Sequence, residues 1–366
     1  MRKLAIAFVF IALTAVLTAA PVMANASQNK ALSGELTLMI NDLGKLPGAA
    51  GGQATSINNR GQVVGLCQFP VAGAPTVSHA FLWTEKDGMI DLGKLPGTTG
   101  SHASGINNRG QVVGGSVTTP PNTRAFLWTP NKGMIDLGSL PGATSVTANA
   151  INDNGQVTGY CTLAGTPTTN HAFLWTAEDG MKDLGTLLGS NNSYAYAINN
   201  AGQIVGYSTF PGTPSPNHAF MWTAEDGMKD LGKLPGSIGS LARGINEKGQ
   251  VVGYCMFAGS PSTSHAFLWT AEEGMTDLGM LPGAPSSFAF AINERGQVVG
   301  WSGATGASHA FLWTSVSGMV ALGELPGKPQ SVAFSINNKG DIVGWSGVPT
   351  STGQNVVLWT LHKSMG

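Results

Sequence analysis

Five histidines recur at equivalent places in a repeating pattern, and histidine can bind metals or transfer protons. The repetition assigns them to separate copies of one unit, so they cannot converge within the ligand distance of about 2 Å. Two further copies carry Arg124 and Asn355 at this position, and both of these residues can donate a hydrogen bond. The pattern therefore predicts a structural donor, to a backbone carbonyl or a carboxylate, and no metal site. The histidines are His79, His171, His218, His265 and His309.

Six aspartates recur in the same way, with Ala321 in the remaining copy. A catalytic pair of carboxylates needs one convergent and asymmetric cluster, and a repeated position supplies neither. We therefore interpret these residues as hydrogen-bond acceptors and predict no catalytic residue among them. They are Asp42, Asp91, Asp136, Asp183, Asp230 and Asp277.

Three cysteines, Cys67, Cys161 and Cys255, occupy one position in alternate copies, and serine stands there in the others. Alternate copies lie beyond the Cα separation of about 7 Å that a disulfide permits. The cysteines are therefore predicted to be buried free thiols that serine can replace.

The positions at which the copies differ are better candidates for a binding site. In each copy, two variable residues stand four and two places before a recurrent Ile-Asn pair, and we expect both to flank a central channel. Aromatic faces beside a few polar donors suit a sugar or another small polar ligand. The outer set is Gln53, His102, Thr147, Tyr194, Leu241, Phe288 and Val332. The inner set is Thr55, Ser104, Asn149, Tyr196, Arg243, Phe290 and Phe334.

A second aromatic group stands one segment later, with Leu66 and Gly115 in the first two copies. These rings either fill gaps between neighbouring copies or form an aromatic platform over copies three to seven. The group is Tyr160, Tyr207, Tyr254, Trp301 and Trp345. From all these positions, the predicted ligand-binding residues are His102, Asn149, Tyr194, Tyr196, Arg243, Phe288, Phe290, Trp301 and Trp345.

The elements that position these residues are short strands. Seven copies of a unit of about 47 residues each contain four apolar segments separated by turn residues, such as Asp87-Gly88. This pattern predicts an all-β fold, a seven-bladed β-propeller with four-stranded antiparallel blades. The last copy lacks its fourth segment, which stands instead at residues 36–46. We therefore expect the N-terminal strand to close the last blade, in one domain over 36–360 with a tail at 361–366.

The first residues predict export. Arg2 and Lys3 precede an apolar run, and Ala24-Asn25-Ala26 has the small-residue pattern of a cleavage site. We expect a signal peptide at 1–26, a linker at 27–35 and a secreted protein, periplasmic or extracellular. Charged residues make up 11% of the chain without a Lys/Arg cluster. This composition argues against nucleic acid or an anionic membrane as a partner. No second long apolar stretch follows, so we expect no membrane insertion after cleavage.

The strings His-Ala-Phe-Leu-Trp-Thr and Asp-Leu-Gly-x-Leu-Pro-Gly resemble the HAF repeat family of bacterial extracellular proteins, over essentially the whole mature chain. Arg124 and Asn355 depart from the histidine of the name. The resemblance implies a secreted repeat protein with a propeller fold, and it brings no activity or catalytic residues.

The leading functional hypothesis is a non-catalytic binding module for a glycan, a peptide or a protein. It would use the channel mouth and the face with the long loops, as a monomer without a cofactor. One alternative is a hydrolase or lyase, with His102 and Arg243 as acid/base and anion clamp. The other is a structural scaffold of the surface or matrix, which would form oligomers.

Overall fold

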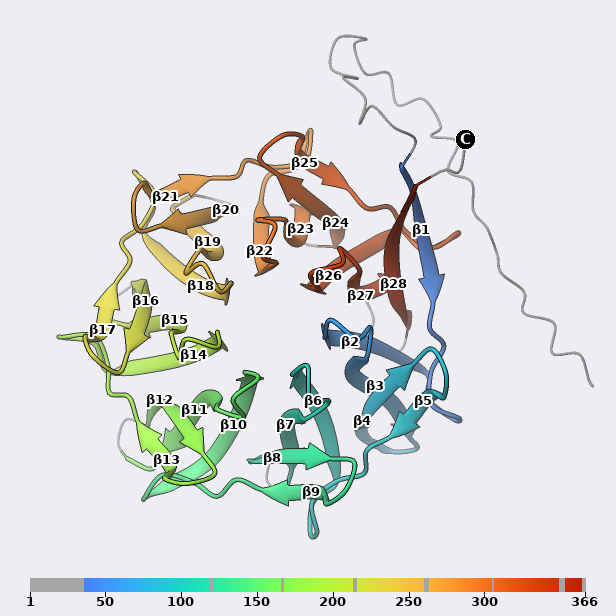
Figure 1. Cartoon of the computed structure of the whole chain (residues 1–366), viewed down its shortest axis with the longest axis horizontal. Coiled ribbons are helices and arrows are strands. Elements are labelled where there is room, and N and C mark those ends of the chain that lie inside the picture. The colour runs from blue at the N-terminus through green and yellow to red at the C-terminus, as the bar shows by residue number, and fades with distance from the viewer. Residues whose placement is uncertain are drawn as a thin grey trace, which may run out of the picture.

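The computed structural model describes residues 36–118, 122–165, 168–212, 216–259, 263–304, 306–348 and 353–363. In these residues the chain forms only strands and turns. The strands assemble into seven four-stranded antiparallel sheets around a central axis (Figure 1). The predicted seven-bladed β-propeller is confirmed. The predicted signal peptide and linker lie outside the described residues, as do 364–366.

Blades one to six take their strands in chain order from the axis outward, and in blade seven the outermost strand comes from the N-terminal end. Blade one has β2 (Gly51–Ile57), β3 (Val63–Val71), β4 (Ala74–Thr84) and β5 (Gly88–Asp91). Blade two has β6 (Gly100–Ile106), β7 (Val112–Val117), β8 (Thr123–Thr129) and β9 (Gly133–Asp136). Blade three has β10 (Ala143–Ile151), β11 (Val157–Leu163), β12 (Thr169–Thr176) and β13 (Gly180–Asp183). Blade four has β14 (Asn192–Ile198), β15 (Ile204–Thr209), β16 (Asn217–Thr223) and β17 (Gly227–Asp230). Blade five has β18 (Gly239–Ile245), β19 (Val251–Phe257), β20 (Thr263–Thr270) and β21 (Gly274–Asp277). Blade six has β22 (Ser287–Ile292), β23 (Val298–Ala304), β24 (Ala307–Thr314) and β25 (Gly318–Ala321). Blade seven has β26 (Gln330–Ile336), β27 (Ile342–Gly347), β28 (Gln354–Lys363) and, from the other end of the chain, β1 (Leu36–Asp42).

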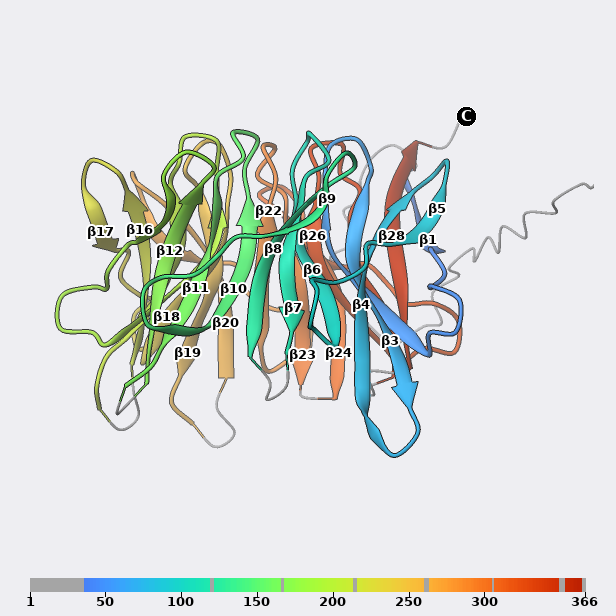
Figure 2. The same cartoon turned by 90° about the horizontal axis from the view of Figure 1, so that it is seen from below.

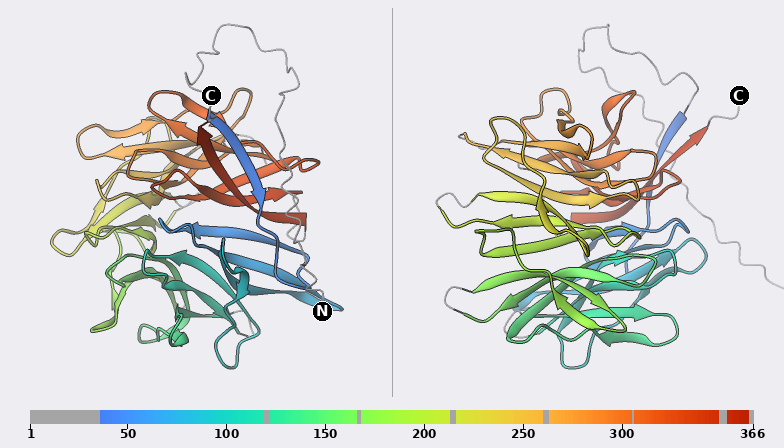
Figure 3. Two further views of the ribbon diagram at one scale, coloured as in Figure 1. Left: turned by 45° about the vertical axis from the view of Figure 1, so that its right-hand side comes forward. Right: turned by 60° about the vertical axis from the view of Figure 1, so that its left-hand side comes forward.

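Strand β1 closes the last blade by pairing with β28, so the two ends of the described chain lie side by side (Figure 3). The register runs from Leu36 opposite Lys363 to Asp42 opposite Val357. The prediction that the N-terminal strand closes the last blade is therefore confirmed, with pairing over residues 36–42. Strand β28 continues to Lys363, three residues beyond the predicted end of the domain at residue 360. This closure leaves the edge of β28 paired instead of exposed.

The core lies between the blades. One cluster joins Val205 and Ala219 of blade four to Ala242, Val251 and Phe267 of blade five. Equivalent clusters occur at the other blade interfaces, which explains why both faces of the inner strands are apolar. A fully buried phenylalanine anchors the third strand in six blades. They are Phe81, Phe126, Phe173, Phe220, Phe267 and Phe311.

The two faces of the disc differ (Figure 2). Tight turns on one face join the first strand of a blade to the second, and in the turn of blade one Gly61 has a φ of 79° and donates to the Asn58 carbonyl. The longer connections between second and third strands lie on the other face, called here the long-loop face. There the hairpin of β3 and β4 projects furthest in Figure 2. In the described residues there is no helix of the length and apolarity that crossing a membrane requires.

Candidate functional site

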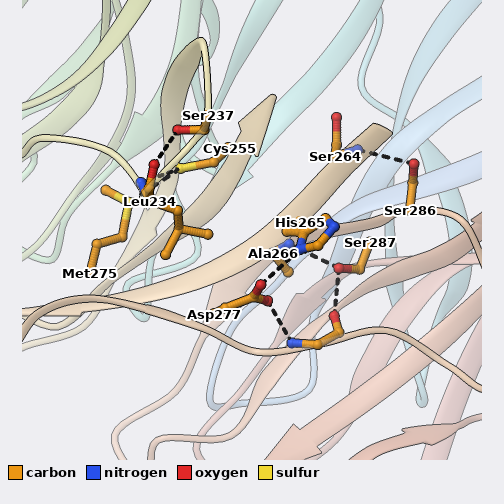
Figure 4. A network of polar contacts seen from close by, with 11 residues as sticks. Leu234, Ser237, Cys255, Ser264, His265, Ala266, Met275, Asp277, Ser286 and Ser287 are labelled. Atoms are coloured by element: carbon orange, nitrogen blue, oxygen red, sulfur yellow. Dashed lines mark hydrogen bonds and ion pairs between the residues drawn. The ribbon is translucent and has the colours of Figure 1, made fainter. Parts of the chain in front are cut away.

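The recurrent histidines pair with carboxylates of the fourth strand, which confirms their predicted structural role. In four blades the imidazole Nδ1 lies 2.7 Å from the aspartate Oδ2, as in His265 and Asp277 (Figure 4). The other oxygen of Asp277 accepts the Gly279 N–H at 2.8 Å. Each pair therefore fixes the turn that leads to the next blade, and the aspartates act as the predicted acceptors.

The exceptions keep the same interaction. Arg124 donates to Asp136, and the Asn355 amide donates to Asp42 across the closing strands at 2.7 Å. In blade six, where Ala321 replaces the aspartate, His309 Nδ1 lies 2.8 Å from Glu324 Oε1. Among the described residues no group of three or more potential ligand side chains could hold a metal ion.

The cysteines are free and buried, as predicted. Their sulfur accepts the hydrogen bond that serine accepts in other blades. The Leu234 N–H donates to Cys255 Sγ at 3.3 Å (Figure 4), and the Leu95 N–H donates to Ser116 Oγ at 3.0 Å. Burial raises the thiol pKa of all three cysteines, that of Cys161 to about 11, so they are poor nucleophiles.

The inner set of variable residues coincides with a β-bulge in every innermost strand. Each of these residues falls between two paired positions, as Arg243 does between Ala242 and Gly244. A bulge leaves its extra residue unpaired and re-aims its side chain. The seven bulge residues are Thr55, Ser104, Asn149, Tyr196, Arg243, Phe290 and Phe334.

In blades one and three the bulge side chains are short and polar, and they hydrogen-bond to the next blade. Thr55 Oγ1 donates to the Ala103 carbonyl at 2.9 Å, and Asn149 Nδ2 donates to the Ala195 carbonyl at 2.7 Å. These bonds run from blade to blade around the axis. Asn149, a predicted ligand-binding residue, therefore has its amide engaged within the fold.

In blades four to seven the bulge side chains are large, and we call Tyr196, Arg243, Phe290 and Phe334 the aromatic half of the axis. The Arg243 guanidinium lies 4.0 Å from the centre of the Tyr196 ring. Phe290 and Phe334 stack with their centroids 5.4 Å apart. Two pairs of neighbouring bulge residues thus contact each other, Tyr196 with Arg243 and Phe290 with Phe334, and all four side chains are only partly buried.

A hollow of about 360 Å³ extends this aromatic half between blades six and seven. Four of the eight residues that line it are aromatic, which gives the hollow flat apolar walls. The aromatic residues are Phe290, Trp301, Phe334 and Trp345, and the others are Ala304, Gly306, Ser308 and Val332. It includes three of the predicted ligand-binding residues: Phe290, Trp301 and Trp345.

The second aromatic group lies opposite the outer set in the strand pairs. Tyr207 faces Tyr194, and Trp301 faces Phe288. Their rings stack, and rings of adjacent blades also meet, as Tyr160 does with Tyr194 at 5.0 Å. The rings therefore fill the space between blades, which is one of the two predicted roles. Besides this filling, Trp301 and Trp345 face the hollow.

His102 lies in a different place from Arg243. It faces Gly115, where an added Cβ would stand 2.6 Å from His102 Cε1, and it lines a cavity of about 490 Å³ with Leu66 and Val77. Burial lowers the His102 pKa, which favours the neutral imidazole. The Arg243 guanidinium lies by the rings of Tyr196 and Tyr254, in blades four and five. The acid/base and anion clamp expected of the enzyme alternative is therefore not assembled.

Two closed rings of hydrogen bonds, which the sequence did not predict, surround the mouth of the central channel on the face with the tight turns, called here the tight-turn mouth. In one, the asparagine of each Ile-Asn pair donates its side-chain amide to the backbone carbonyl of the equivalent asparagine in the next blade, as from Asn152 to Asn199 at 2.9 Å. In the other ring, the residue after each of these asparagines accepts a hydrogen bond through its side-chain oxygen. The donor is the backbone N–H of the equivalent residue in the preceding blade, as from Asn59 to Asn108. The seven acceptors of this second ring are Asn59, Asn108, Asp153, Asn200, Glu247, Glu294 and Asn338.

These rings surround a cavity of about 220 Å³ to which all seven blades contribute. Burial raises the Glu247 pKa, and the neighbouring Glu294 and Asp153 raise it further. The signal in the sequence was the Ile-Asn pair itself, which is followed in all seven copies by a side chain with an acceptor oxygen.

Comparisons with known proteins support the propeller fold and identify no family. No family model matches the chain, and no curated protein matches it. A streptogramin B lyase structure has a TM-score of 0.54 at 11% identity, over 89% of this chain and 98% of the other. An acylaminoacyl peptidase of Pyrococcus horikoshii has a TM-score of 0.57 at 10% identity, over 87% of this chain and 53% of the other. A puromycin-hydrolyzing peptidase of Mycobacterium tuberculosis has a TM-score of 0.55 at 12% identity, over 85% and 52%.

The chain thus spans about half the length of the two peptidases. At these identities the likeness shows the propeller fold alone. The resemblance to the HAF repeat family stays a prediction from the repeat motif.

Proposed function

We propose that this propeller is a secreted, non-catalytic binding module whose ligand, a glycan, docks on the aromatic half of the axis and its hollow. The observation that carries the proposal is the break in symmetry at the bulge positions. Thr55, Ser104 and Asn149 are short, whereas Tyr196, Arg243, Phe290 and Phe334 present aromatic faces beside one cation. Function belongs where otherwise equivalent repeats differ, because equivalent positions serve the fold.

The chemistry of the other polar residues supports binding over catalysis. The recurrent histidines and aspartates are engaged with one another at the blade edges. The thiols are protonated at neutral pH because burial raises their pKa. What the aromatic half offers is ring faces for stacking and a few donors for orientation, which is the usual composition of a small-ligand site.

A glycan array probed with the labelled mature protein tests the proposal. We expect selective binding that Phe334→Ala weakens at least tenfold, because the substitution removes one wall of the hollow. Phe69→Ala is the matched control, since the Phe69 ring packs, tilted, against His79 on the third strand of its own blade, with the ring centroids 4.7 Å apart. Circular dichroism verifies that both variants fold. Absence of glycan binding by the wild type, or equal losses in the two variants, contradicts the proposal.

A further inference from the structure

We infer that Arg243 receives a carboxylate, so that the glycan taken by the aromatic half is an acidic one, with a uronic-acid type sugar at this position. The inference rests on the proposed function and adds the charge of the ligand. It starts from a comparison of the arginines in the described chain. Arg60, Arg109 and Arg295 are exposed to water, and Arg124 pairs with Asp136. Arg243 is the one that is partly buried without a carboxylate partner.

The guanidinium of Arg243 has donors to spare. Among the described residues its hydrogen bond is one long contact, from Nη2 to the Tyr254 hydroxyl at 3.4 Å. Its Nε–H is buried and has no acceptor. An arginine carries five N–H donors in a planar fork, so four of those of Arg243 have no partner among the described residues. Leaving a buried donor without an acceptor costs free energy, and a ligand oxygen would remove that cost.

The positive charge of Arg243 also has no carboxylate partner among the described residues. The groups that act on Arg243 are the phenols of Tyr196, Tyr254 and Tyr207, and burial raises the pKa of Tyr207, which keeps it neutral. The acidic residue nearest to Arg243 along the chain, Glu247, lies four residues further on, in the turn that follows β18 at the other mouth of the channel. A carboxylate fits the fork in the bidentate geometry that arginine favours, and it would supply the missing negative charge.

The neighbours of Arg243 favour a sugar as the carrier of that carboxylate. Phe290 and Phe334 occupy the next two bulge positions around the axis, and their stacked rings lead into the hollow. A sugar acid carries a ring for stacking and a carboxylate one bond away from it. The carboxylate would then bind at Arg243, and sugar rings of the glycan would stack at Phe290 and Phe334.

The experiment compares uronic-acid oligosaccharides with their methyl esters, which keep the sugar and remove the charge. We expect the wild type to bind the acid forms at least tenfold more tightly than the esters, with an affinity that falls as salt is added. Arg243→Gln should abolish this preference and keep weak binding to both forms. Arg243→Lys should retain part of the preference, because it keeps the charge without the fork.

The controls separate this inference from the proposed function. Arg124→Gln removes a surface charge of the same type and should leave the preference unchanged. Thermal unfolding with and without the acid oligosaccharide gives a second readout, and the shift in Tm should be lost in Arg243→Gln and kept in Arg124→Gln. Equal binding of acids and esters, weakened by Phe334→Ala, would overturn the acidic ligand and leave the binding module standing. Binding of an acidic peptide instead of any oligosaccharide would show that the ligand is not a glycan.

Discussion

At the scale of the residue, this protein keeps an interaction and varies the side chain that makes it. The donor to the fourth strand is histidine in most blades, arginine in blade two and asparagine in blade seven. The acceptor of a buried leucine N–H is a thiol in some blades and a hydroxyl in others. Such exchanges mark positions that serve the fold. Arg243 differs from these positions because, among the described residues, it has no carboxylate partner and only one long hydrogen bond.

Because the thiol of Cys161 is buried, we expect the free energy of unfolding to decrease as the pH rises through the alkaline range. Its pKa is raised to about 11 when folded, against about 8.5 for a free thiol. The protonated form is favoured by folding, so the contribution is complete below pH 8.5 and is lost as pH rises towards 11. Urea unfolding between pH 7 and pH 10.5 should therefore show wild type losing stability relative to Cys161→Ser. A constant difference between the two proteins across this range would contradict the prediction.

At the scale of the element, the decisive feature is the bulge in each innermost strand. The strands could be predicted from their apolar segments and turn residues, and so could the variable positions on the first strand. The bulge could not, because it is a property of two strands together. Its sequence trace is a glycine in the second strand, such as Gly253, where an added Cβ would stand 1.9 Å from the Leu241 carbonyl oxygen.

Replacement of Gly253 by alanine should therefore disrupt the bulge that presents Arg243. The new methyl group meets the backbone, which has no room to move, so we expect a loss of at least about 3 kcal/mol in unfolding free energy. Gly88→Ala is the matched control. It sits at a φ of 69° in an open turn, and the strain there costs about 1 kcal/mol. Urea denaturation measures both, and comparable losses would show that the close approach is not what requires glycine.

At the scale of the whole molecule, the propeller is closed by strand β1 and by the hydrogen-bond rings at the tight-turn mouth. The closing strand was predictable, because a segment missing at one end of the repeats stands at the other. The separation of His102 from Arg243 was not, because sequence equivalence gives the blade and the position along a strand but not the contacts. The unpaired state of Arg243 likewise depends on residues from two blades.

A chain that begins at Leu43 lacks β1 and should expose the edge of β28. We expect a lower unfolding midpoint and association that grows with protein concentration, because an open strand edge pairs with other chains. Analytical ultracentrifugation and thermal unfolding measure the two effects. The control is a permuted chain in which Thr360 is followed by the turn Glu85-Lys86-Asp87-Gly88 and residues 40–46. It should recover both properties, and a truncated chain that stays monomeric and equally stable would contradict the role of β1.

The two rings at the tight-turn mouth also bear on how the molecule comes apart. In an open array of repeats, the terminal units have one neighbour and fray first. Here Asn337 of the last blade donates to the Asn58 carbonyl of the first, and Asn338 to the side chain of Asn59. Every blade consequently has two neighbours and no blade is terminal. Loss of structure at any one blade must break contacts on both of its sides, so these seven similar units are built to unfold as one.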